Sequence, residues 1–160
     1  MNEESIQFGH DVTLKGTLSI PNESKSLYPA VLILSGSGPL DRDGNGKQKF
    51  NLYNKLAQVF SEEGCATLRY DKRGVGESEG DGHSAGMKDL IEDARSALYY
   101  LKTHPSIDHE KIFIAGHSEG AMLATAIAAK EDLAGVIFIS GAAQTLKEAI
   151  DYQRQLVTEE

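Results

Sequence analysis

Apolar and polar positions along the chain change period several times, and each change marks a predicted element. Residues 12–20 alternate imperfectly and are interrupted by Gly16, which predicts an early antiparallel strand with one face in water. Residues 30–35, AVLILS, are continuously apolar and precede glycines, as is typical of a strand buried on both faces of a parallel sheet. Three later strands are predicted at CATLRY (65–70), KIFIAG (111–116) and GVIFIS (135–140).

Between these strands, apolar residues recur at helical spacing. A first helix stops at Gly64, and its apolar positions are Leu52, Leu56, Val59 and Phe60. A second amphipathic helix, over residues 87–101, ends before Pro105, and an alanine-rich stretch predicts a third over 121–130. Strands that alternate with helices predict an α/β fold, a doubly wound and mostly parallel sheet covered by helices on both faces.

The last residues follow a different pattern. Residues 145–160 open with a capping box, Thr145 to Glu148, and predict a weakly amphipathic helix with no strand after it. At 160 residues the chain is long enough for one sizeable core and too short for two ordinary domains. We therefore expect a single domain.

Composition narrows the classes of partner. The formal net charge is −8, with acidic residues scattered throughout, whereas nucleic-acid binding needs clustered Lys and Arg. No apolar run approaches the ~20 residues of a membrane span. The first residues, MNEESIQFGH, are acidic and polar, unlike a secretory signal, which predicts a cytoplasmic protein. Cys65 is the only cysteine, which excludes a disulfide framework and favours a small core residue.

Ser118 lies in the segment FIAGHSEGA, between a predicted strand and a predicted helix. A serine nucleophile must stand clear of the sheet on a strained strand-to-helix turn, which needs small neighbours such as Gly116 and Gly120. The carboxyl ends of parallel strands are where open α/β sheets bind ligands, and the helix N-terminus favours developing negative charge. We expect a catalytic Ser118; the alternative is a tight structural turn with an inert serine.

Acyl transfer also needs two donors for the oxyanion. The N–H of Glu119, directly after the serine, is the expected first donor, and the second comes from the loop after an earlier strand. The segment ILSGSGP (33–39) follows such a strand, and its small residues allow close approach to a substrate, so the N–H of Ser37 is the candidate. The alternative is a glycine-rich turn with no such role.

The same loop invites two other interpretations. Gly36 and Gly38 resemble the start of a dinucleotide fingerprint, but Pro39 interrupts it and Asp41 replaces the third glycine. Asp41, Asp43 and Asn45 match half of a calcium loop, but its closing acid would fall at the helical Leu52. We therefore expect no cofactor and no metal.

Charged residues in these loops are assigned structural roles instead. Asp41, Arg42 and Asp43 are expected to hold their loop by local hydrogen bonds and an ion pair. In RYDKRGVGES (69–78), Asp71 and Arg73 are expected to brace the loop, with a place on the pocket rim as the alternative.

Three segments together carry a family resemblance: SGSGPLDRDGNG, RYDKRGVGESEG and AGHSEGA, in this order. The chain resembles the first half of an α/β-hydrolase, particularly bacterial serine esterases related to dipeptidyl aminopeptidases and acylaminoacyl peptidases. The resemblance implies an enzyme that cleaves esters, thioesters or amides of small molecules through an acyl-enzyme on Ser118. It also implies that residues 1–145 are the N-terminal part of the hydrolase core and residues 146–160 the start of a lid or connecting helix.

The histidines depart from the family pattern. Family members place the acid and the histidine after the serine, yet no histidine follows His117. His117 adjoins the serine and is expected to pack in the turn or line the pocket, which leaves His83 as the remote stand-in base. We expect a hydrolase truncated before its last strands, nearly inactive as given, and a homo-oligomer joined at the exposed sheet edge or through residues 145–160. The alternatives are a non-catalytic module that self-associates and a nucleotide-binding domain.

Overall fold

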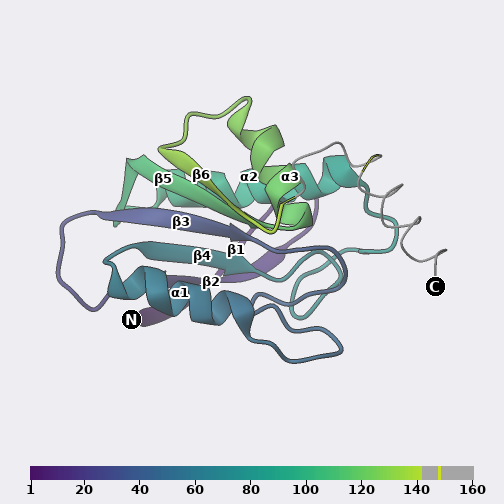
Figure 1. Cartoon of the computed structure of the whole chain (residues 1–160), viewed down its shortest axis with the longest axis horizontal. Helices are drawn as coiled ribbons and strands as arrows, with labels where there is room; N and C mark the ends of the chain where they lie inside the picture. The colour runs from purple at the N-terminus through teal and green to yellow at the C-terminus, as the bar shows by residue number, and fades with distance from the viewer. Residues whose placement is uncertain (142–147, 149–160) are drawn as a thin grey trace.

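A computed structural model describes residues 1–141 and 148 of the chain, and the described residues form six strands and three helices (Figure 1). In chain order the elements are β1 (Asn2–Phe8), β2 (Leu14–Ile20), β3 (Tyr28–Leu34), α1 (Leu52–Glu62), β4 (Ala66–Tyr70), α2 (Met87–Thr103), β5 (Ile107–His117), α3 (Glu119–Ala128) and β6 (Gly135–Ile139). Every strand and helix predicted before residue 141 is confirmed, with shifts of a few residues at the ends.

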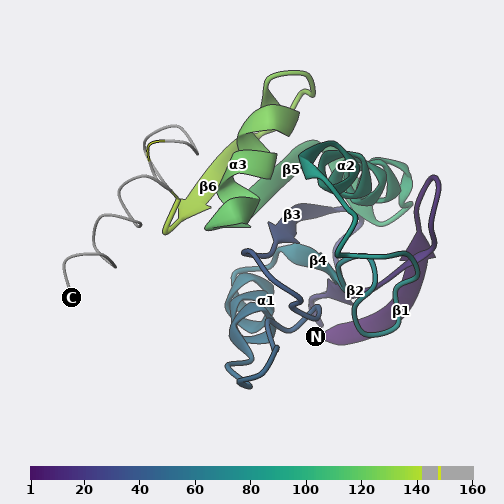
Figure 2. The ribbon, with the colours of Figure 1, turned by 90° about the vertical axis from the view of Figure 1, so that its right-hand side faces the viewer.

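The six strands form one sheet in the order β1-β2-β4-β3-β5-β6. The β1–β2 and β2–β4 pairs are antiparallel, whereas β4, β3, β5 and β6 run parallel to one another. Helix α1 covers one face of the sheet, and α2 and α3 cover the other (Figure 2). The fold is therefore the predicted α/β fold with a mostly parallel, doubly wound sheet.

The core has two parts, one on each face of the sheet. The larger part joins Leu32 and Ile114 of the sheet to Leu98 of α2, and all three are almost fully buried. Apolar side chains leave water in this way because their burial stabilises the fold by ~25 cal/mol per Å². The smaller part lies under α1, around the buried Tyr53 and Ala57.

The buried face of α1 differs from the prediction. Leu52 and Val59 were expected to face the core, but they are 36% and 56% exposed, and Tyr53 and Ala57 are buried instead. A tyrosine and an alanine carry a weaker apolar signal than valine. The apolar pattern therefore predicted an inner face of α1 that lies part of a turn away from the observed one. Cys65 is half-buried beside this smaller core, and burial raises the pKa of its thiol.

Strand β1 was not predicted from the sequence. Its residues are mostly polar and exposed, and Ile6 is its only buried residue. The strand forms by pairing antiparallel with β2, from Asn2 opposite Ile20 to Phe8 opposite Leu14. Backbone hydrogen bonds to β2, rather than burial of its own side chains, therefore hold β1 in the sheet.

Two further expectations concern the end of the chain. Strand β6 lies at the edge of the sheet among the described residues, as expected. The capping box and the helix predicted over 145–160 lie outside the described residues, apart from residue 148. Within residues 1–141 and 148, no helix has the length and hydropathy needed to cross a membrane.

Candidate active site

The candidate site is assembled at the carboxyl ends of the parallel strands. The arrowheads of β3 and β4 point to the same side of the molecule (Figure 1), and β5 runs parallel to β3. The segments that follow these strands therefore meet at one edge. They carry the glycine-rich loop after Leu34, the charged loop after Tyr70, and Ser118.

Ser118 occupies a sharp turn between β5 and α3. Its backbone angles are φ 53° and ψ −114°, outside the regions that residues other than glycine ordinarily adopt. Its N–H donates to the Ile139 carbonyl at 2.9 Å, and its own carbonyl accepts from the Ala121 N–H at 3.0 Å. The predicted strained turn at the end of a central parallel strand is confirmed, and a strained backbone of this kind is frequent at functional sites.

The two glycines that flank Ser118 allow this turn because no side chain would fit at either position. A methyl group on Gly120 would clash with the Leu34 carbonyl and lie 2.8 Å from the Ser35 carbonyl oxygen. A methyl group on Gly116 would clash with Gly120 and lie 2.7 Å from the Ala121 Cα. The first turn of α3 is thus in backbone contact with the end of β3.

The glycine-rich loop after β3 reaches the serine. A methyl group placed on Gly36 would lie 3.5 Å from the Ser118 Cβ, so the loop lies beside the side chain of the serine. The Gly36 N–H donates to the Tyr53 hydroxyl at 2.8 Å. Ser37, the next residue, is exposed, and its N–H is the next donor along the loop.

Tyr53 connects this loop to the turn. Its hydroxyl also lies 2.9 Å from His117 Nδ1, and the two rings pack edge to face. The prediction that His117 packs in the turn is confirmed. Burial raises the pKa of the Tyr53 hydroxyl, which therefore stays protonated. Tyr53 was missed in the sequence, although a tyrosine on the inner face of a helix must find a partner for its hydroxyl.

Lys72 was also missed, between two residues assigned to bracing. Its Nζ lies 2.7 Å from a carboxylate oxygen of Glu119 and donates to the Gly36 carbonyl at 3.1 Å. Only 12% of the lysine side chain and 23% of the glutamate side chain are exposed. The sequence carried no local signal for this contact, because Lys72 lies in the loop after β4 and both of its partners belong to distant segments.

Bracing by the neighbouring charged residues is confirmed. Asp41 accepts the N–H groups of Asp43 and Asn45 at 2.9 and 2.8 Å, which closes the loop locally. Arg42 forms an ion pair with Asp71 at 2.6 Å. Within the part of the chain that the structure describes, no cluster of metal-ligating side chains occurs.

The other ion pairs tie the loops to the body of the sheet. Arg73 pairs with the buried Asp93 of α2 at 2.6 Å. Arg69, which is 2% exposed, pairs with Asp43 at 2.9 Å and with Glu3 of β1 at 2.7 Å.

Two opposing effects set the pKa of Asp71. Burial raises the pKa, but hydrogen bonds from the Arg42 guanidinium and from the N–H groups of Glu77 and Arg42 outweigh it. The pKa of this carboxyl is therefore held below its ordinary value, and the ion pair persists at neutral pH.

His83 lines a cavity of about 340 Å³ whose wall also includes Gly38, Lys72, Arg73 and Glu119. The loop of His83 thus faces the site across this cavity, and Arg73 has a place on its rim as well as in the bracing. The side chain of His83 is exposed, and its backbone N–H donates to Asp81 at 2.9 Å. The structure shows no contact between His83 and Ser118 that would support His83 as the stand-in base.

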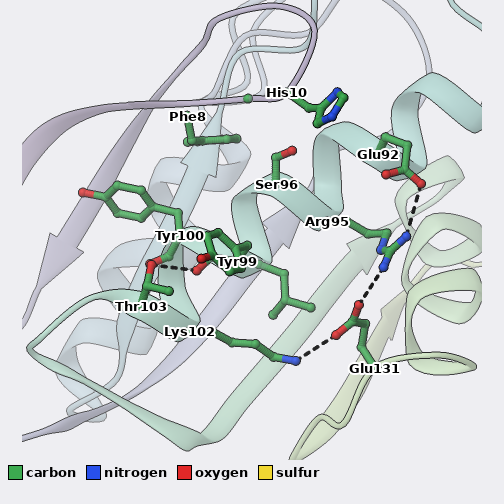
Figure 3. A pocket seen from close by; sticks show the side chains of 12 residues that line it. Phe8, His10, Glu92, Arg95, Ser96, Tyr99, Tyr100, Lys102, Thr103 and Glu131 are labelled. Carbon is green, nitrogen blue, oxygen red and sulfur yellow. Dashed lines mark hydrogen bonds and ion pairs between the residues drawn. The ribbon is translucent and has the colours of Figure 1, made fainter.

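A larger hollow, of about 550 Å³, lies away from Ser118, between the end of β1 and α2 (Figure 3). His10 and Tyr100 are among its lining residues. Glu131 lies between Arg95 and Lys102 on one wall and pairs with them at 3.1 and 2.9 Å. The larger volume of this hollow is no evidence that it takes part in the chemistry of the serine.

Comparison with known proteins places this geometry in a family. The family model described as serine aminopeptidase, S33, matches residues 46–158. The chain is 35% identical to esterase EstD of Thermotoga maritima over 88% of its own length, and 29% identical to polyketide transferase af380 of Aspergillus fumigatus over 84%. The crystal structure of the α/β hydrolase GrgF from Penicillium sp. sh18 superposes with a TM-score of 0.75 at 21% identity, over 99% of this chain and 53% of that one.

The fold and the turn at Ser118 define an α/β hydrolase. The chain belongs to the serine aminopeptidase S33 family of this class. It spans 33% of the length of the esterase and 44% of that of the transferase. The catalytic role of Ser118 and the donor roles of Ser37 and Glu119 stay predictions.

Replacement of Gly120 by alanine tests the contact between α3 and β3. We expect Gly120→Ala to lower the free energy of unfolding by about 1–3 kcal/mol, because the new methyl group would clash with the backbone of Leu34 and Ser35. Gly86→Ala is the control, since a methyl group there would lie 3.7 Å from Asp89. Denaturant unfolding measures both, and equal values for the two variants would contradict the packing described.

Replacement of Asp71 by asparagine tests the bracing of the loops. Because the folded pKa is lowered, the carboxylate stabilises the fold fully above the unfolded value of 3.8, and this contribution is lost as pH falls through the folded pKa. We expect Asp71→Asn to lower the free energy of unfolding by about 2–3 kcal/mol at pH 7, and by progressively less as pH falls below 3.8. Asp132→Asn, at an exposed position after α3, is the control, and a pH-independent effect of Asp71→Asn would refute the assignment.

Proposed function

We propose that the protein is a serine hydrolase that cleaves a carboxylic ester, thioester or amide through an acyl-enzyme on Ser118. The observation that carries the proposal is the left-handed φ of Ser118 at the junction of β5 and α3, in a chain of the S33 family. This backbone turns the serine out of the sheet, in the arrangement known as a nucleophile elbow. An inert serine in a structural turn would gain nothing from the strain.

The chemistry follows from the groups around the serine. Ser118 Oγ attacks the substrate carbonyl carbon and gives its proton to a base, and the carbonyl oxygen becomes an oxyanion. Glu119 is the first residue of α3, and the first N–H groups of a helix have no intrahelical acceptor, so its N–H is a donor for that oxyanion. Since Tyr53 occupies the Gly36 N–H, the Ser37 N–H supplies the second donor.

The base returns its proton to the leaving group, which departs as the alcohol, thiol or amine and leaves the acyl group on Ser118. Water then attacks the acyl carbonyl, releases the acid and restores the serine. The names of the relatives, an esterase and a polyketide transferase, support acyl chemistry and not one substrate. Ester, thioester and amide substrates therefore stay together in the proposal.

The base is proposed to lie outside the 160 residues. No histidine follows His117, whose Nδ1 is engaged by Tyr53. The greater length of the curated relatives supports a later origin for the histidine and its acid partner. The 160-residue chain by itself is therefore proposed to be nearly inactive.

Turnover of p-nitrophenyl acetate and labelling by a fluorophosphonate test the role of Ser118. In the full-length protein we expect Ser118→Ala to abolish both, whereas Ser96→Ala, in the remote hollow, changes neither. For the 160-residue chain we expect turnover to be lower by a factor on the order of 10⁶, the cost of losing triad members. Rapid labelling of the short chain, with turnover that Ser118→Ala abolishes, would show that a base such as His83 lies within it.

We also propose that two copies of the 160-residue chain pair along β6. Ile137 and Phe138 of this strand are 38% and 58% exposed, so both of its faces carry accessible apolar side chains. Among the described residues no strand lies beyond β6, and an edge of unpaired backbone groups is a template for a second chain. A second copy offers the same edge and closes the pairing by two-fold symmetry.

Light scattering tests the pairing. We expect the 160-residue chain to have the mass of a dimer or larger assembly, and Phe138→Lys to shift it toward the monomer, because a buried charge opposes association. Phe50→Lys is the control, since Phe50 is equally accessible, at 63%, and lies in a loop away from β6. A monomer before any substitution refutes the proposal.

A further inference from the structure

Lys72 contacts both segments to which the oxyanion donors are assigned. Its Nζ donates to the Gly36 carbonyl at 3.1 Å, in the loop after β3, and lies 2.7 Å from the Glu119 carboxylate, at the start of α3. The lysine itself belongs to a third segment, the loop after β4. One ammonium group therefore joins three segments that are far apart in the sequence.

The contact with the Gly36 carbonyl fixes more than that oxygen. The Gly36 C=O and the Ser37 N–H belong to one planar trans peptide unit and point in opposite directions. Whatever holds the carbonyl therefore sets the direction of the Ser37 N–H. If this unit turned over, the carbonyl oxygen would take the place of the N–H and repel an oxyanion.

The loop needs such a restraint because of its composition. Glycine allows rotation about both of its backbone bonds, so a peptide unit beside Gly36 turns easily unless it is held. Tyr53 holds the preceding unit through the Gly36 N–H at 2.8 Å, but it leaves the Gly36–Ser37 unit free. Lys72 supplies the contact to that second unit.

A purely stabilising ion pair does not account for this arrangement. A pair between Lys72 and Glu119 needs no carbonyl, whereas the ammonium hydrogen bonds to both acceptors and is largely shielded from water. A cation on the carbonyl also polarises the peptide unit and strengthens its N–H as a donor. Both effects act on Ser37.

We infer that Lys72 is a positioning residue that holds the Gly36–Ser37 peptide with its N–H directed at the oxyanion. The inference rests on the proposed function for its catalytic meaning. Its structural content, the orientation of one peptide unit by one lysine, stands without that function.

Kinetics of Lys72→Met in the full-length protein give the first test. With p-nitrophenyl acetate we expect kcat to fall about 10- to 100-fold, less than the loss of an oxyanion donor itself, and KM to change less than about twofold. Lys72→Arg keeps a cation within reach of both acceptors and is expected to retain most of the activity. Lys102→Met is the matched control, because Lys102 pairs with Glu131 at 2.9 Å on the far hollow (Figure 3).

An unchanged kcat for Lys72→Met, an equal fall for Lys102→Met, or an effect confined to KM overturns the inference. If the wild-type protein shows no turnover that depends on Ser118, the proposed function is refuted instead. In that case a crystal structure of Lys72→Met decides the inference. We expect the Gly36–Ser37 peptide to be turned or to adopt two orientations, and a single unchanged orientation overturns it.

Discussion

The close contact between the first turn of α3 and the end of β3 is the constraint on which the site depends. Gly120 lies against the Leu34 carbonyl, and the register of the sheet places Leu34 opposite Gly116. Between Gly116 and Gly120 the chain passes from strand to helix at Ser118, whose φ is 53°. The turn is thus consistent with the packing of the backbone around it, and this is the position at which we propose Ser118 as the nucleophile.

Polar contacts then hold the loops around this turn. Tyr53 and Lys72 approach Gly36 from different elements and occupy its N–H and its carbonyl. Behind them, Arg42 and Arg73 fasten the loop after β4 to a neighbouring loop and to α2. Because these partners are buried or half-buried, their ion pairs are screened less by water than pairs on an open surface. A glycine-rich segment that would be mobile alone is thereby given a defined conformation.

The positively charged side chains near the site hold loops in position rather than attract a ligand. The chain carries a net charge of −8, yet Arg42, Arg69, Lys72 and Arg73 gather beneath the loops at the carboxyl edge, each paired with an acid. A cation that is paired and largely buried offers little to an anionic ligand in solution. These residues therefore act as restraints on the loops.

The sequence by itself determined the alternation of strands and helices, the mostly parallel sheet and the strained turn at Ser118, because apolar period and glycine placement are local signals. It did not reveal β1, which is held by pairing with β2 and not by its own side chains. It also misplaced the inner face of α1 and left Tyr53 and Lys72 unassigned. Tertiary structure decided those features, because a hydroxyl or an ammonium acquires its role from acceptors that chain folding brings from distant segments.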